Sequence, residues 1–137
     1  MRIAICDDCM KDAVLLKRFL GGHEASVYLD TASLLADMKD KNTKFDLYLL
    51  DIFMEKPMAD NTEGGNAMDG IELAKRLRKI QEEAVICFVS TSNDFYREAY
   101  DLYAVQYLLK PVQEAEVKKL LARVAKSLTA GRQQKIS

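Results

Sequence analysis

The sequence predicts an α/β fold, a (βα)5 arrangement in which five parallel strands form one doubly wound sheet with helices on both faces. Two observations support this fold class. Short apolar runs alternate with segments whose apolar residues have helical spacing, and such alternation favours a parallel sheet with right-handed crossovers. The run Phe45–Asp51 is almost continuously apolar, as expected of a strand that is covered on both faces.

The first two strand–helix units are predicted from apolar runs and a helix stop signal. Arg2–Cys6 is a compact apolar strand, and the helical pattern of Asp8–Leu20 ends at Gly21-Gly22, because glycine commonly follows the last helical residue. Ser26–Leu29 is a weaker second strand. Ser33–Lys41 is expected to form the second helix, since its leucines and its methionine fall on one face.

The remaining units follow the third strand. Asp69–Ile80 has the spacing of a third helix, Ala84–Val89 is a clear fourth strand, and Asn93–Leu102 is predicted as a less apolar fourth helix. Ala104–Leu109 completes the sheet as the fifth strand. An apolar stripe marks the final helix: Val117, Leu120, Leu121, Val124 and Leu128.

Composition narrows the classes of function. The length of 137 residues suits one domain, and an apolar content of 49% is enough for a core. The net charge of −1 gives no overall attraction to nucleic acid, so we expect this domain to bind none. No apolar stretch approaches the roughly 18 residues of a membrane span. With an odd number of cysteines and no expected secretory signal, these features predict a cytoplasmic protein that does not bind membranes.

Three carboxylates follow two of the predicted strands. Asp7 and Asp8 come directly after the first strand, and Asp51 ends the third. Ligands bind at the carboxyl ends of strands in this class of fold, and if the two strands are neighbours the three acids converge there. Protonation or a hard divalent cation would relieve their repulsion, and Mg²⁺ suits carboxylates combined with a phosphate oxygen. Alternatively, they are solvated loop residues, with Asp8 capping a helix.

Two further polar features follow the fourth and fifth strands. Lys110 lies at the end of the fifth strand, where its ammonium could neutralise a carboxylate or a phosphoryl oxygen. Pro111 makes the preceding peptide bond a candidate for the cis form. Ser90 lies just beyond the fourth strand and offers a hydroxyl donor. Both side chains would act at the same sheet edge as the acids.

Several motifs at predicted strand ends occur in a fixed order. They are Ile-Cys-Asp7-Asp8, Leu-Leu-Asp51, Met68-Asp69-Gly70, Phe-Val-Ser90 and Tyr107-Leu-Leu-Lys110-Pro111. With these motifs, residues 2–128 resemble the receiver domain of response regulators in bacterial two-component systems. The last motif, together with the tyrosines of the fourth helix, is most similar to receivers of LytTR-type transcription regulators. The resemblance implies a flavodoxin-like sheet with strand order 2-1-3-4-5.

The resemblance also implies the chemistry. A receiver accepts a phosphoryl group from a sensor histidine kinase in an Mg²⁺-dependent reaction, and by position Asp51 matches the phosphoacceptor. It catalyses only its own phosphorylation and dephosphorylation, so it is not an enzyme in the usual sense. The metal would be held by Asp7, Asp8, Asp51 and the backbone carbonyl of Phe53. The other matched positions are Lys110 as the phosphate-binding lysine, Ser90 as the switch hydroxyl, Tyr107 as the switch aromatic, and Phe53 and Ser92 as side chains that tune water access.

The implied switch is a local rearrangement. After phosphorylation, Ser90 would move toward the phosphate, Tyr107 would turn inward, and the face formed by the fourth helix and the fifth strand would change. We also hypothesise that the bulk of Phe53 slows dephosphorylation. Tyr96, Tyr100 and Tyr103 are expected to be exposed, which makes the fourth helix, fifth strand and final helix a candidate homodimer face.

One segment departs from the family pattern. Met68-Asp69-Gly70 comes much later after the acceptor than in typical receivers, and Glu55 replaces the usual proline. Residues 52–68 therefore form an extended loop, longer than the connections common in compact domains. It is either a tolerated flexible insertion, which costs little to close, or a flap beside the phosphorylation pocket that alters kinase choice or phosphoryl lifetime.

The resemblance ends before the chain does. Residues 129–137 are expected to be a polar tail, or a linker to an output domain absent from this chain. In the second case the protein would control transcription. The alternative is a stand-alone receiver that acts through protein–protein interaction.

Four other functions fit the residues less well. A phosphatase of the haloacid dehalogenase kind needs a second aspartate two positions after its nucleophile, where this chain has Phe53. A pseudo-receiver that is never phosphorylated is disfavoured because Asp51 and Lys110 are both present. Cys6-Asp-Asp-Cys9 has the spacing of a redox pair, but adjacent carboxylates would raise the pKa of a thiol and so make it less reactive. His23 and the cysteines lack the spacing of a zinc site.

Overall fold

Parallel strands form one sheet in the computed structural model, which describes residues 1–54 and 69–136. The strands are β1 (Arg2–Cys6), β2 (Glu24–Tyr28), β3 (Leu47–Asp51), β4 (Ile86–Ser90) and β5 (Gln106–Leu109). Their order across the sheet is β2-β1-β3-β4-β5, which confirms the predicted fold class and strand order. Because β1 lies directly beside β3, with Cys6 opposite Leu50, these two strands end side by side.

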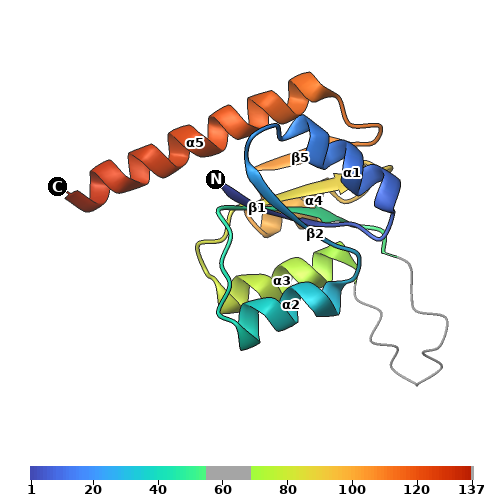
Figure 1. The fold of residues 1–137 in the computed structure, drawn as a ribbon, viewed down its shortest axis with the longest axis horizontal. Helices are drawn as coiled ribbons and strands as arrows, with labels where there is room; N and C mark the ends of the chain where they lie inside the picture. Colours follow the sequence, from blue (N-terminus) through green and yellow to red (C-terminus); the bar gives the residue numbers. More distant parts are fainter. Residues whose placement is uncertain (55–68, 137) are drawn as a thin grey trace.

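Helices cover both faces of the sheet (Figure 1). The helices are α1 (Met10–Phe19), α2 (Thr31–Asp40), α3 (Gly70–Ile80), α4 (Tyr96–Asp101) and α5 (Glu114–Ile136). Side chains alternate between the two faces along each strand. Ile3 and Ile5 therefore pack in the core beneath α1 and α5, whereas Ala4 and Cys6 pack in the core beneath α2, α3 and α4.

The start of α3 is fixed by two adjacent residues. Asp69 is the N-cap, and its carboxylate accepts a hydrogen bond from the Glu72 N–H at 2.8 Å. Gly70 then lies against the end of β3, where its N–H donates to the Ile52 carbonyl at 2.9 Å. A β-carbon on Gly70 would lie only 2.8 Å from the Ile52 Cα, so this close approach needs a residue without a side chain.

A buried polar network joins the start of β3 to the end of α3, at the N-terminal ends of the strands. The Tyr48 hydroxyl accepts a hydrogen bond from the Phe45 N–H at 3.1 Å and donates one to Gln81 Oε1 at 2.5 Å. Gln81 Nε2 donates in turn to the Phe45 carbonyl at 3.3 Å. Because Tyr48 is fully buried, each of these bonds satisfies a group that water does not reach.

The observed elements differ from the predicted ones mainly at their ends. The third strand begins at Leu47, because the Phe45 N–H before it donates to the Tyr48 hydroxyl. The fourth helix is shorter than expected, because the Asp94 N–H donates to Ser92 Oγ in a turn before it. The alternative of Asp8 as a helix cap is wrong: the N-cap of α1 is Cys9, in an extended backbone conformation.

The last helix is longer than its apolar stripe. It continues to Ile136, so the expected boundary at residue 128 falls within a helix, and its C-terminal part runs beyond the sheet in Figure 1. Alanine, lysine, arginine and glutamine, which are good helix formers, are frequent in this part of the sequence. The extended loop predicted for 52–68 falls largely on residues 55–68, outside the described residues. Within the described ranges, no helix combines the length and apolar character that crossing a bilayer requires.

Candidate functional site

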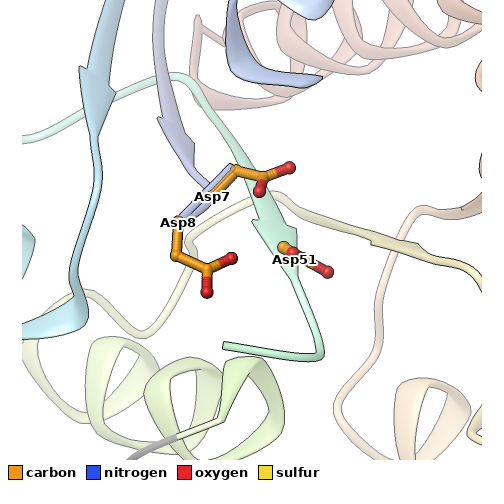
Figure 2. A group of neighbouring side chains, drawn as sticks. All are labelled: Asp7, Asp8 and Asp51. Atoms are coloured by element: carbon orange, nitrogen blue, oxygen red, sulfur yellow. The ribbon is translucent and has the colours of Figure 1, made fainter. Parts of the chain in front are cut away.

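Acidic side chains gather where β1 and β3 end. Asp7 and Asp51 are 1% and 5% exposed, and Asp8 is partly exposed. Each of the three offers a carboxylate oxygen within 4.8 Å of the other two. Figure 2 shows Asp7 and Asp8 following β1, with Asp51 on the neighbouring strand. The acids therefore converge as expected from adjacent strand ends.

Lys110 reaches the same cluster from the end of β5. Its Nζ lies 3.0 Å from Asp7 Oδ2 and 3.3 Å from Asp51 Oδ2, and its side chain is 13% exposed. The Lys110 N–H donates to the Ser90 carbonyl at 2.8 Å, which holds the backbone of the lysine beside the end of β4. The Lys110-Pro111 peptide bond is cis, so the form expected from the sequence is confirmed.

Asp12 also contacts Lys110, although it was not among the site residues predicted from the sequence. Its Oδ2 lies 2.8 Å from the Lys110 Nζ, closer than either of the other carboxylates, and its side chain is 41% exposed. Asp12 is in the first turn of α1, and helical side chains lean toward the helix N-terminus. Its place four residues after Asp8 is therefore the signal that could have indicated it.

The site carries more negative than positive charge. Burial, followed by the charge of Asp7, raises the pKa of Asp51 to about 7, although Lys110 acts in the opposite direction. Burial acts to lower the pKa of Lys110, but hydrogen bonds to Asp12 and Asp7 and the charge of Asp51 outweigh burial and raise it. The bond to Lys110 lowers the pKa of Asp12. The raised pKa of Asp51 reflects its burial first, and then the excess of carboxylates over the single lysine.

This arrangement fits a hard divalent cation. Such ions prefer oxygen ligands, and Mg²⁺ binds through a small number of carboxylates. Carboxylate oxygens come from two adjacent strand ends, on Asp7, Asp8 and Asp51. The side chains of Asp7 and Asp51 are buried, and a cation would neutralise their charge. The donor chemistry and the unbalanced charge both match what a metal centre requires.

Ser90 and Tyr107 meet through the loop that follows β4. Ser90 is fully buried, and its Oγ accepts a hydrogen bond from the Ser92 N–H at 3.1 Å. The Tyr107 hydroxyl donates to the Ser92 carbonyl, and its ring packs edge-on against Tyr96 with centroids 4.5 Å apart. A displacement of Ser90 would therefore disturb the same loop residue that holds the Tyr107 hydroxyl.

Phe53 lies beside Asp51. Its N–H donates to Asp51 Oδ1 at 3.2 Å, and its side chain is 48% exposed. The Phe53 ring packs edge-on against Phe95, with centroids 5.3 Å apart. This contact places an aromatic ring between the end of β3 and the residue that precedes α4.

The cysteines lack the environment of a redox pair. Cys6 and Cys87 are buried, Cys9 is exposed, and all three are free thiols. Burial, with the charges of Asp30 and Asp7, raises the pKa of Cys6 to about 12. The thiol is therefore protonated at neutral pH, as the adjacent carboxylates led us to expect.

Comparisons with known proteins agree with this geometry. Residues 3–122 match the family described as the response regulator receiver domain. Among curated proteins, the sensory transduction protein LytT of Bacillus subtilis is 30% identical over 130 residues, which cover 92% of this chain and 48% of LytT. The chain thus spans about half the length of this relative.

Solved structures with the same fold include two receivers. The response regulatory domain of protein mrkE from Klebsiella pneumoniae has a TM-score of 0.75 and 22% identity, covering 93% of this chain and 97% of that one. The response regulator TrrA from Thermotoga maritima, solved in complex with Mg²⁺ and BeF, has a TM-score of 0.72 and 24% identity, covering 90% and 97%. At these identities the likeness establishes the fold.

Proposed function

The chain belongs to the response regulator receiver family, and from this premise we propose that Asp51 accepts a phosphoryl group from a sensor histidine kinase. The observation that carries the proposal is the position of the Asp51 carboxylate, buried at a strand end beside Asp7 and within reach of Lys110. Phosphoryl transfer depends mainly on positioning and on stabilisation of charge. The cluster supplies both.

The proposed reaction forms a bond between an Asp51 carboxylate oxygen and phosphorus while the phosphorus–nitrogen bond to the donor histidine breaks. The negative charge of the transferred group lies on its equatorial oxygens. The Lys110 ammonium would donate to one of them, and the Ser90 hydroxyl to another. Phe53 would limit the access of water to the product.

The cofactor of this reaction would be Mg²⁺, which supplies charge neutralisation and binds a phosphoryl oxygen when it is present. Asp7, Asp8 and Asp51 would hold it through carboxylate oxygens, and the backbone carbonyl of Phe53 would be a further ligand. A positive charge beside Asp51 favours its ionised form, which is the nucleophile. The raised pKa of Asp51 thus supports a site that would bind a cation.

The proposed switch uses the bonds around Ser92. If Ser90 moved to donate to a phosphoryl oxygen, this displacement would break the bond that its Oγ accepts from the Ser92 N–H, and the Ser92 carbonyl that holds Tyr107 would be free to shift. Tyr107 would then turn inward. The face formed by α4, β5 and α5 would change with it, and the exposed rings of Tyr96, Tyr100 and Tyr103 make this face our candidate for a homodimer contact.

We propose that residues 1–128 form the receiver in the cytoplasm and that 129–137 lead toward an output. The resemblance to LytTR-type transcription regulators makes control of transcription through a further domain the favoured output. Action as a stand-alone receiver is the alternative. The two are separated by testing whether residues encoded beyond Ser137 bind DNA.

Incubation with acetyl phosphate and Mg²⁺, followed by mass spectrometry, tests the function. We expect one acid-labile phosphoryl adduct on Asp51, none in the Asp51→Asn variant, and a normal adduct in Asp40→Asn, which removes an exposed acid at the end of α2. A protein without any adduct would be a pseudo-receiver. Continuous turnover of acetyl phosphate without an adduct would indicate a phosphatase instead.

A further inference from the structure

We propose that Asp12 is a positioning residue that competes with the phosphoryl group for the ammonium of Lys110. This inference rests on the proposed function of Asp51 as the phosphoacceptor. It assigns to Asp12 the role of holding the lysine in its unphosphorylated position, and so of setting how tightly the site retains a phosphoryl group.

The hydrogen-bonding capacity of Lys110 is fully used in the structure. A lysine ammonium has three N–H donors, and its Nζ lies within 3.3 Å of oxygens from Asp7, Asp12 and Asp51. A phosphoryl oxygen on Asp51 can therefore accept a hydrogen bond from Lys110 only if one of these carboxylates loses its hydrogen bond to the lysine.

Asp12 differs from the other two partners in its surroundings. Asp7 and Asp51 are buried and belong to the cluster that can hold a metal ion, whereas Asp12 comes from α1 and is 41% exposed on its side chain. A cation bound by Asp7 and Asp51 would compensate their charge and weaken their need for Lys110. Asp12 would keep its charge, and its bond to the lysine is the shortest of the three.

The surroundings of the pair allow the lysine to move. A cavity of about 50 Å³ lies beside Asp12 and Lys110, lined mainly by apolar side chains that include Leu16, Val89 and Pro111. This volume corresponds to about one or two water molecules. This space beside the pair leaves room for a small shift of the Lys110 side chain.

The expected effect is modest because one partner of the pair is exposed. Ion pairs of this kind contribute about 0.2–1 kcal/mol, which corresponds to a change in affinity of about 1.4- to 5-fold. We therefore expect the Asp12→Asn variant to bind BeF₃⁻, an analogue of the phosphoryl group, about two- to fivefold more tightly than the wild type.

Isothermal titration with BeF₃⁻ at saturating Mg²⁺ tests the proposal on the whole chain. Asp12→Glu should restore wild-type affinity, because it keeps the carboxylate. Asp40→Asn is the matched control: it removes the same charge from an exposed acid at the end of α2, and its affinity should equal that of the wild type. In a Lys110→Met background, Asp12→Asn should not change the affinity for BeF₃⁻, because the ammonium for which Asp12 and the phosphoryl group compete is absent.

Each outcome decides between the possibilities. Equal affinities for Asp12→Asn and the wild type would overturn the proposal. So would an equal gain in Asp40→Asn, which would indicate a general effect of charge, or a gain that persists without Lys110. A wild-type protein that binds no BeF₃⁻ would overturn the proposed function itself, and this inference with it.

Discussion

Gly70 and Asp51 are in direct backbone contact, although they are far apart in the sequence. A β-carbon built on Gly70 would lie 2.8 Å from the carbonyl carbon of Asp51. The first residue of α3 therefore lies directly against the end of β3, and this contact helps to fix the backbone that carries the Asp51 carboxylate.

The Gly70→Ala variant is expected to be destabilised, because the added methyl group must displace either α3 or the end of β3. Overpacking of this kind costs about 1–3 kcal/mol of unfolding free energy, measurable by urea denaturation. Gly22→Ala is the matched control, since a β-carbon there has no neighbour within 4 Å. If both variants unfold at the same urea concentration, the contact does not constrain the fold.

The Phe53→Ala variant should lose its phosphoryl group several-fold faster than the wild type. Removing the ring takes away the edge-on contact with Phe95 and opens the acceptor to water. The half-life of the phosphorylated protein, measured after removal of acetyl phosphate, provides the test. Tyr100→Ala also removes a ring, but one that is 82% exposed on α4, and it should leave the half-life unchanged. An unaltered half-life in Phe53→Ala would refute the hypothesis.

The stability of the metal-free protein should depend on pH through Asp51. Its pKa is raised from 3.8 to about 7 by burial and by Asp7, so between these values the folded state retains a proton that the unfolded state has lost. The contribution of Asp51 to stability is fully present below the lower value and is lost as pH rises through about 7.

In a chelating buffer, the unfolding free energy of the wild type should therefore fall relative to Asp51→Asn between about pH 5 and about pH 8, by on the order of 1–3 kcal/mol. Added Mg²⁺ should reverse much of this fall, because it binds the ionised form. Chemical denaturation of both proteins across the pH range provides the measurement. If the unfolding free energies of the wild type and of Asp51→Asn changed with pH in parallel, both with and without Mg²⁺, the assignment of the raised pKa to Asp51 would be contradicted.

The Tyr48→Phe variant should be destabilised by about 1–3 kcal/mol, because it leaves the buried Gln81 Oε1 and the Phe45 N–H without their hydroxyl partner. Tyr100→Phe makes the same chemical change on an exposed ring and should be neutral within about 0.5 kcal/mol. Thermal and urea denaturation both measure the difference. Equal stability of the two variants would show that the network contributes nothing.

The sequence predicted most accurately the positions of polar residues that directly follow predicted strands. Asp51 and Lys110 could be placed at one sheet edge because each follows an apolar run, and the carboxyl ends of parallel strands share that edge. The structure places the Lys110 Nζ 3.3 Å from Asp51 Oδ2. The roles assigned to these residues remain proposals that rest on the family.

Asp12 was missed because apolar periodicity constrains only the side of a helix that faces the core. Ala13 and Leu16 define that side of α1, but they do not say whether a polar neighbour faces solvent or a lysine from a distant strand. The Tyr48–Gln81 bond was missed for a similar reason. A strand pattern treats tyrosine as an apolar residue, and its hydrogen-bond partner is 33 positions away in the sequence.

The ammonium of Lys110 binds Asp12 and Asp7, which lie 98 and 103 positions away from it in the sequence. The acids on β1 and β3 can gather before β5 has joined the sheet, but their cation arrives only with that edge strand. On the proposed function, phosphorylation of Asp51 would therefore depend on β5 and would report whether this edge strand is in place.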